Sequence, residues 1–191
     1  MDWIKKTLQP NGTLKNKLNI KSAKALQELE FRLTQYKYRS IPEYRIMRID
    51  DLKKIHCWLF SDLYVWSGEY RTGDFHKDGT DFFPISRFDF AIENLNRQIE
   101  HVNKANYRSD LALAIDLGKL LLDINMFHPF REGNGRTQRL FVTLLAKQKG
   151  KMVHLRKGDP AYNNYMTASI NDDNQLMAKV VLNAFGSNQK D

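Results

Sequence analysis

Apolar residues recur every three or four positions along much of this chain, which is the spacing that places them on one face of an α-helix. A first helix is predicted from Ser22, as its N-cap, to about Arg39, where Ile41-Pro42 breaks the pattern. Its buried face is predicted to consist of Leu26, Leu29, Leu33 and Tyr36. A second helix is predicted to begin at Asp50 and to bury Leu52, Ile55, Leu59 and Leu63, with Trp58 and Trp66 also in the core.

Five further helices are predicted in the rest of the chain. Their approximate bounds are 86–103, 109–126, 134–149, 161–170 and 175–185. The helix at 109–126 is apolar nearly all round, which predicts that it is buried. The helix at 134–149 is predicted to end at Gly150 and to turn Leu140, Phe141, Leu144 and Leu145 inward. Residues 186–191 are predicted to fray.

Residues 70–84 depart from the helical pattern. Asp78-Gly79 lies there between apolar flanks, which is a turn signal for a β-hairpin. The fold class predicted is therefore mainly α, a helical bundle with one small β-hairpin. Because no repeat or long linker interrupts the chain, a single domain is expected over residues 1–191, with its core at about 10–185.

Composition places the chain among ordinary globular proteins. It is 42% hydrophobic and 27% charged, which is enough apolar material for a core and argues against disorder. The lone Cys57 lies in an apolar run, so a buried inert thiol is favoured over a catalytic cysteine. We expect a cytoplasmic bacterial protein without a membrane span, because no run approaches about 18 apolar residues.

The net charge of +8 admits two interpretations. One is nucleic-acid binding, and the other is a basic, soluble surface around a phosphate pocket. The basic residues are scattered, and none of their clusters is interleaved with aromatic residues. We therefore favour the second interpretation.

The twelve residues from position 128, HPFREGNGRTQR, concentrate chemical groups that handle phosphates. His128 can accept a proton near neutral pH, since the ordinary pKa of histidine is about 6.5. Glu132 can hold Mg²⁺. The Gly133-Asn134-Gly135 backbone can approach an anion where a loop becomes a helix, and Arg136 and Arg139 share a face of that helix.

This run resembles the signature of the Fic family, and every fixed position of that signature is filled. Residues 11–18 are similar to the family's N-terminal lead-in, and residues 59–71 to the segment before its hairpin flap. The resemblance covers roughly residues 10–170. It implies the Fic fold, in which a flap at about 70–84 lies over the active site and offers an edge for a target segment.

The resemblance implies AMP transfer from ATP to a Ser, Thr or Tyr hydroxyl of a target protein. His128 is then the catalytic base, and Phe130 is expected to anchor the loop in the core. Glu132 is expected to hold Mg²⁺, and the amides of Gly133–Gly135 to stabilise phosphate charge. Arg136 and Arg139 are expected to hold the β- and γ-phosphates. A branch of the family with Lys in place of Gly135 phosphorylates instead.

Further nucleotide contacts are expected from the flap and from a later helix. These residues are Lys77, Asp78, Gly79, Thr80, Asn164 and Tyr165. The motif does not fix the base of the nucleotide, so transfer of another nucleotide or phosphate-linked group stays open. A catalytically idle basic binding module is the alternative from another class.

Many Fic proteins carry a blocking helix with the pattern Ser or Thr, three residues, Glu, then Gly or Asn. None of the seven glutamates here has Ser or Thr four positions earlier. The chain is therefore interpreted as the stand-alone type, without an inhibitory motif. A separate small antitoxin is expected to offer a glutamate to Arg139, which makes the chain the toxin or effector half of a pair. Secretion into a host cell stays open.

Overall fold

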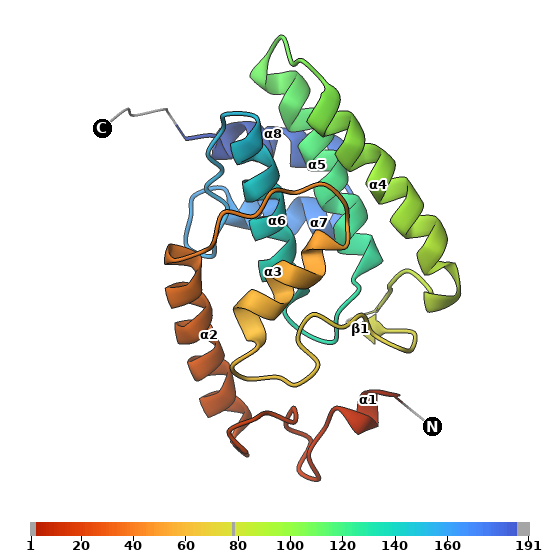
Figure 1. Cartoon of the computed structure of the whole chain (residues 1–191), viewed down its shortest axis with the longest axis vertical. Helices are drawn as coiled ribbons and strands as arrows, with labels where there is room; N and C mark the ends of the chain where they lie inside the picture. Colours follow the sequence, from red (N-terminus) through yellow and green to blue (C-terminus); the bar gives the residue numbers. More distant parts are fainter. Residues whose placement is uncertain (1–2, 78, 187–191) are drawn as a thin grey trace.

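Helix α5 (Asp110–Phe127) runs through the middle of the computed structural model, which describes residues 3–77 and 79–186 (Figure 1). It packs against α8 (Asn174–Ala184), α4 (Phe88–Lys104) and α6 (Asn134–Gln148). Nine of its residues are buried, among them Leu117, Leu120 and Leu121. The predicted mainly helical bundle is confirmed.

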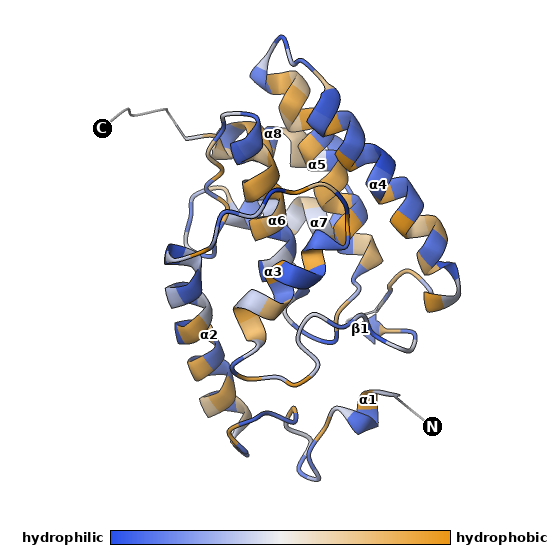
Figure 2. Cartoon of the chain, in the orientation of Figure 1, coloured by the Kyte–Doolittle hydropathy of each residue, from blue (hydrophilic) through white to orange (hydrophobic). Residues whose placement is uncertain are grey.

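The remaining helices surround this centre. Helix α3 (Asp51–Phe60) packs against α6, α2 (Ala23–Arg39) packs against α3, and α7 (Tyr162–Asn171) packs against α8. The short helix α1 (Trp3–Lys6) and a 3₁₀ turn (Ile85–Arg87) complete the set. In Figure 2, hydrophobic and hydrophilic residues recur in turn along α4, which buries Ala91, Leu95, Ile99 and Val102.

Two predicted helix faces need correction. In α5, Leu111 is 50% exposed and Ile115 51% exposed, so its first turns are not buried all round. In α2, Leu26 is buried as predicted, but Tyr36 is 70% exposed. The other buried positions of α2 are polar, namely Glu30, Thr34 and Lys37. They are buried because they find partners, which a search for apolar periodicity cannot detect.

Helix α3 confirms its predicted stripe, since Leu52, Ile55, Leu59 and the following Leu63 are all buried. Trp58 and Trp66 are only partly buried, packed against the core. The predicted burial of Cys57 was wrong, because Cys57 is exposed. Successive residues of a helix point in different directions, so Cys57 faces solvent although its neighbour His56 is buried.

The hairpin region forms only a minimal antiparallel ladder. Strand β1 (His76–Lys77) pairs with β2 (Thr80–Asp81), and one further hydrogen bond, from Phe82 N to Phe75 O at 3.1 Å, continues the ladder. No extended hairpin flap is formed by the described part of residues 70–84, and Asp78 lies outside the described residues. The neighbouring amides pair elsewhere, since Arg71 N donates to Pro129 O at 2.7 Å and Phe83 N to Met126 O at 3.1 Å.

Of the two predicted N-caps, Ser22 is confirmed, because its side chain accepts a hydrogen bond from Ala25 N. The prediction for Asp50 was wrong, because its side chain makes no cap hydrogen bond to α3. The side chains of Ser109 and Asp173, which were not predicted as caps, accept from the amides of Ala112 and Leu176. Gly150 adopts a φ of +74° directly after the C-cap of α6, as a helix stop requires. Residues 187–191 lie outside the described part of the chain. None of the described helices has the length and apolar character that crossing a bilayer would require.

Candidate active site

The motif occupies the junction between α5 and α6. Helix α5 ends at Phe127, and His128 caps it in the left-handed region, with φ 41° and ψ 58°. Phe130 is fully buried, and its ring stacks on His56 at 3.9 Å between centroids. The predicted anchoring role of Phe130 is therefore confirmed. The anchor fixes a short loop that joins the end of one helix to the beginning of the next.

His128 is half-buried beside the hairpin region. Its ring stacks on Phe82 at 3.7 Å between centroids, and its Nδ1 lies 3.3 Å from Asn125 O. Because a carbonyl oxygen only accepts, this contact favours the tautomer with a proton on Nδ1 and a lone pair on Nε2. That nitrogen is the one suited to receive a proton from an incoming hydroxyl.

Arg71 links the backbone at His128 to the backbone of the hairpin region. Its Nε donates to His128 O at 3.0 Å, its Nη1 to Gly73 O at 2.7 Å, and its Nη2 to Phe83 O. The side chain is buried, and this burial lowers the pKa of Arg71. Sequence reasoning gave this arginine no role, since it lies 57 positions from the histidine that it positions.

The loop that leads into α6 is shaped by Gly133 and Asn134. Gly133 has a φ of +80°, and a Cβ there would lie 2.4 Å from ring atoms of Phe60. Its amide donates to Glu132 Oε1 at 2.9 Å. The Asn134 side chain is buried and pairs with both Phe130 N and Phe130 O at 2.8 Å. A nucleotide contact from Asn134 is therefore left to its backbone.

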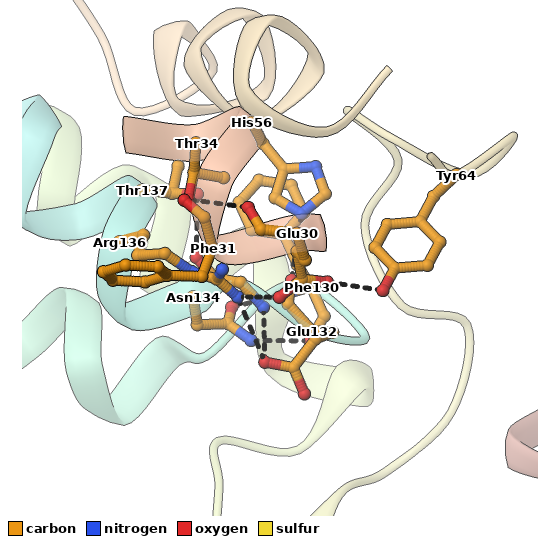
Figure 3. A network of polar contacts seen from close by, with 11 residues as sticks. Glu30, Phe31, Thr34, His56, Tyr64, Phe130, Glu132, Asn134, Arg136 and Thr137 are labelled. Atoms are coloured by element: carbon orange, nitrogen blue, oxygen red, sulfur yellow. Dashed lines mark hydrogen bonds and ion pairs between the residues drawn. The ribbon is translucent and has the colours of Figure 1, made fainter. Parts of the chain in front are cut away.

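Arg136 takes part in the polar network of Figure 3. Its Nη2 forms an ion pair with Glu30 of α2 and lies 3.8 Å from Glu132 Oε1. Its guanidinium also stands over the Phe60 ring at 4.8 Å. Glu30 in turn accepts a hydrogen bond from the Tyr64 hydroxyl. Periodicity alone did not predict this buried glutamate.

Arg139 has different surroundings. It is 8% exposed and stands over Tyr162 and Tyr165, at 5.2 and 5.1 Å from their ring centroids. Its Nε is buried without a hydrogen-bond partner. No ion pair is formed at Arg139 by any carboxylate in the described part of the chain. Such a buried cationic group is suited to an external anion.

His56 contacts the backbone of Glu132. Its Nδ1 accepts from Gly68 N at 2.8 Å, which leaves Nε2 to donate to Glu132 O at 3.0 Å. Burial lowers the pKa of His56 to about 4, so the ring stays neutral near pH 7. This residue was also missed, because a buried histidine on an apolar helix face has no distinctive sequence signal.

The remaining predicted nucleotide contacts are scattered. Tyr165 is buried and accepts a hydrogen bond from Gln138 Nε2 at 2.7 Å, so it has almost no surface to offer a nucleotide. Asn164 is exposed on α7. Lys77 and Thr80 lie on the two short strands, with Gly79 between them at a φ of +81°. Asp78 lies outside the described residues.

The metal-binding prediction depends on one carboxylate. Within residues 3–77 and 79–186, no group of three or more His, Cys, Asp or Glu side chains is placed to share a metal ion. Glu132 has a side chain that is 38% exposed, at the loop that precedes α6. A single carboxylate fits Mg²⁺, which commonly takes its other ligands from water and substrate phosphates.

Together, the fold and the site define a helical protein that presents an imidazole and two guanidiniums around the loop between α5 and α6. The chain belongs to the Fic/DOC family, whose sequence model matches residues 46–146. The protein adenylyltransferase VbhT of Bartonella schoenbuchensis is 30% identical over 142 residues, which are 73% of this chain and 30% of VbhT. An Escherichia coli protein named "Probable protein adenylyltransferase Fic" is 28% identical over 72% of this chain and 69% of its own length.

A solved structure shows the same fold. The VirB-translocated effector BepC of Bartonella tribocorum, crystallised with bound AMPPNP, superposes with a TM-score of 0.84 at 22% identity. The match covers 99% of this chain and 100% of that chain. The chain thus spans the length of that Fic domain but less than a third of VbhT.

Proposed function

We propose that this chain is a protein adenylyltransferase, which transfers AMP from ATP to a hydroxyl side chain of a target protein. The observation that carries the proposal is the α5–α6 junction, where the end of one helix presents His128 and the start of the next presents Arg136 and Arg139. Family membership supports it, since the relatives named above are protein adenylyltransferases. The AMPPNP bound to BepC supports ATP as the substrate.

In the proposed reaction, His128 Nε2 takes the proton from the target hydroxyl. The hydroxyl oxygen forms a bond to the α-phosphorus of ATP while the bond from that phosphorus to the pyrophosphate oxygen breaks. Pyrophosphate leaves with its electron pair, and AMP remains on the target. The loop amides and the guanidiniums of Arg136 and Arg139 stabilise the phosphate charge, with the β-phosphate at Arg136 and the γ-phosphate at Arg139.

Glu132 would hold Mg²⁺ at this site. The ion would supply charge neutralisation to the phosphates. In the structure the Glu132 carboxylate accepts from Gly133 N, so the carboxylate and the first loop amide are mutually satisfied. A Glu132 carboxylate that held the ion would no longer accept from the Gly133 amide, which would leave that amide for phosphate.

Gly135 favours nucleotidyl transfer over phosphorylation. A Cβ at this position would meet only Arg139 Nη1, at 3.2 Å. A longer side chain would therefore enter the space beside the guanidinium to which we assign the γ-phosphate. Glycine leaves that space to the nucleotide.

We propose that the target protein docks at the hairpin region beside His128. Phe82 directly follows β2 and stacks on the imidazole, so a segment lying along this ladder would reach the base. An added strand needs only backbone hydrogen bonds, which would allow targets of different sequence. The nucleotide contacts expected from Lys77, Asp78, Gly79 and Thr80 are a separate proposal for the same region.

We also propose that a separate antitoxin regulates the site. Arg139 has a buried Nε without a partner, and the blocking pattern is absent from all seven glutamates of the sequence. A glutamate supplied by another protein would pair with Arg139 and displace the γ-phosphate. The chain would then be the toxin or effector half of such a pair.

Label transfer tests the proposed activity. The protein is incubated with Mg²⁺, a bacterial lysate and ATP labelled on the α-phosphate, and in parallel with ATP labelled on the γ-phosphate. We expect α-label on protein and no γ-label. His128→Ala should abolish the α-label, whereas His101→Ala, which changes an exposed histidine, should retain it. Transfer of γ-label, or unchanged α-label with His128→Ala, would refute the proposal.

The antitoxin proposal has its own test. Each of the seven glutamates is replaced by glutamine, and the label transfer of each purified variant is compared with that of the purified wild type. We expect the wild type to be active alone and no variant to exceed it. A many-fold increase for any one glutamate variant would show that the chain blocks itself.

A further inference from the structure

Helix α2 contacts both the guanidinium and the backbone of Arg136. The Glu30 carboxylate forms an ion pair with the guanidinium, and the Tyr38 hydroxyl donates to Arg136 O at 2.7 Å. Glu30 and Tyr38 lie two turns apart on one helix, and both lie outside the region that the family model matches. One helix therefore fixes both the backbone and the side chain of a residue assigned to the nucleotide.

Glu30 is itself fixed within the core. It is 6% exposed, and its Oε2 accepts from the hydroxyl of Tyr64, which is 1% exposed. The Tyr64 ring is stacked on Trp66 at 4.3 Å between centroids, so the hydroxyl has little freedom. Each carboxylate oxygen has a separate partner, with Oε1 on Arg136 and Oε2 on Tyr64. The carboxylate cannot rotate without breaking one of these contacts.

This arrangement orients the guanidinium of Arg136 and still leaves some of its N–H donors for a ligand. Glu30 takes Nη2, and the Phe60 ring supports the guanidinium plane at 4.8 Å. A guanidinium carries five N–H donors in a fixed fork. The ion pairs with Glu30 and Glu132 both use Nη2, so donors on Nε and Nη1 are left for a phosphate oxygen, while the fork already points in a set direction.

We infer that Glu30 is a positioning residue, which acts through Arg136 to orient the guanidinium for the nucleotide's β-phosphate. The inference rests on the proposed function for the role of Arg136. Its physical basis is pre-organisation, because a binding group that is already oriented loses less freedom when the ligand arrives. If Glu30 instead competed with phosphate for Arg136, its removal would tighten nucleotide binding.

The first experiment compares variants of two glutamates on α2. Glu30→Ala and Glu30→Gln are set beside Glu28→Ala, which changes an exposed glutamate two positions earlier. Affinity for AMPPNP with Mg²⁺ is measured by calorimetry at a temperature where each variant is shown to be folded by circular dichroism. Transfer kinetics with ATP are measured in parallel.

We expect Glu30→Ala to weaken AMPPNP affinity and to raise the KM for ATP by about tenfold to a hundredfold, the scale that small misplacements cause. The KM for the target protein should stay unchanged. Glu30→Gln keeps an acceptor for Nη2, so it should restore most of the affinity. Glu28→Ala should match the wild type. A folded Glu30→Ala variant with wild-type or tighter AMPPNP affinity would overturn the inference.

The second experiment repeats Glu30→Ala in an Arg136→Ala background. If Glu30 acts only through Arg136, the second substitution should cause no further loss of AMPPNP affinity. It should also raise the melting temperature above that of Arg136→Ala alone, because the single variant leaves a buried carboxylate without its cation. A further loss of affinity in the double variant would show that Glu30 acts by another route.

These outcomes separate the inference from the proposed function. If the wild type binds AMPPNP with Mg²⁺ and transfers α-label, the proposed function stands, whatever Glu30 does. If the wild type binds AMPPNP but transfers no α-label, AMP transfer fails, while the calorimetric comparison still tests Glu30. Both readouts are therefore made on the same wild-type protein.

Discussion

The two halves of the site are held in place by different forces. Around His128, Arg71 donates to the backbone carbonyls of His128 and Phe83. Around Arg136, the Tyr38 hydroxyl also contacts the backbone, but the guanidinium is held by side chains, mainly through an ion pair with the buried Glu30. His128 is thus held through its main chain, whereas the Arg136 guanidinium is held mainly through charge. A main-chain clamp tolerates replacement of the base itself, whereas an ionic network suffers when either charged partner is lost.

Removing the base should give the largest effect on activity and a small effect on stability. We expect His128→Ala to lower the rate of α-label transfer by about 10²–10⁴-fold, the contribution of a positioned base. The variant should stay folded, because Arg71 contacts the backbone and not the imidazole. Steady-state kinetics and thermal melting test this pair of outcomes. A collapse of stability with His128→Ala would contradict the main-chain clamp.

Removing the Arg71 side chain should mainly lower the stability of the fold. Arg71→Met leaves the carbonyls of Gly73, Phe83 and His128 without these donors. We expect a loss of about 3 kcal/mol in the free energy of unfolding, since each buried unsatisfied group costs about 1–3 kcal/mol. Urea denaturation measures it, with Arg97→Met as the exposed control. Equal stabilities for the two variants would refute the role assigned to Arg71.

Helix α6 is flanked by a matched pair of glycines, Gly133 before it and Gly150 after it. Gly133 and Gly150 both have positive φ, but only at Gly133 would a Cβ meet the Phe60 ring. Gly150→Ala should cost about 1 kcal/mol for its backbone alone. Gly133→Ala should cost about 2–3 kcal/mol, because overpacking adds to the backbone strain. Urea denaturation of both variants tests the difference, which should be absent if the loop can shift away from Phe60.

The smallest effect depends on pH and involves His56. Its pKa is about 4 in the folded chain and 6.5 in the unfolded chain, so the unfolded state binds the proton first as pH falls. The stabilisation is fully present above pH 6.5 and is lost as pH falls toward 4. We expect the wild type to lose about 2 kcal/mol more than His56→Gln between pH 6.5 and about pH 5.

Urea titrations at several pH values would measure this difference. His154→Gln, at an exposed position, serves as the control and should follow the wild type. If His56→Gln shows the same pH dependence as the wild type, the buried neutral histidine is not the source of the acid sensitivity.

The motif and most helices could be predicted from the sequence because their signals are local. Helical periodicity, the capping residue Ser22 and the stop at Gly150 each act over a few neighbouring positions. The order of His128, Glu132, Arg136 and Arg139 likewise places them at one helix beginning. The spacing of the motif was therefore enough to predict that these residues lie at the junction of α5 and α6.

Only the tertiary structure decided what holds those groups in place. Glu30 lies 106 positions from Arg136, and Arg71 lies 57 positions from His128. Such pairs depend on how helices pack, and a polar residue that is buried by its partner looks like a surface residue in the sequence. Long-range hydrogen bonds also limit the ladder at 76–81, because the amides of Arg71 and Phe83 donate to carbonyls at the end of α5 and just after it.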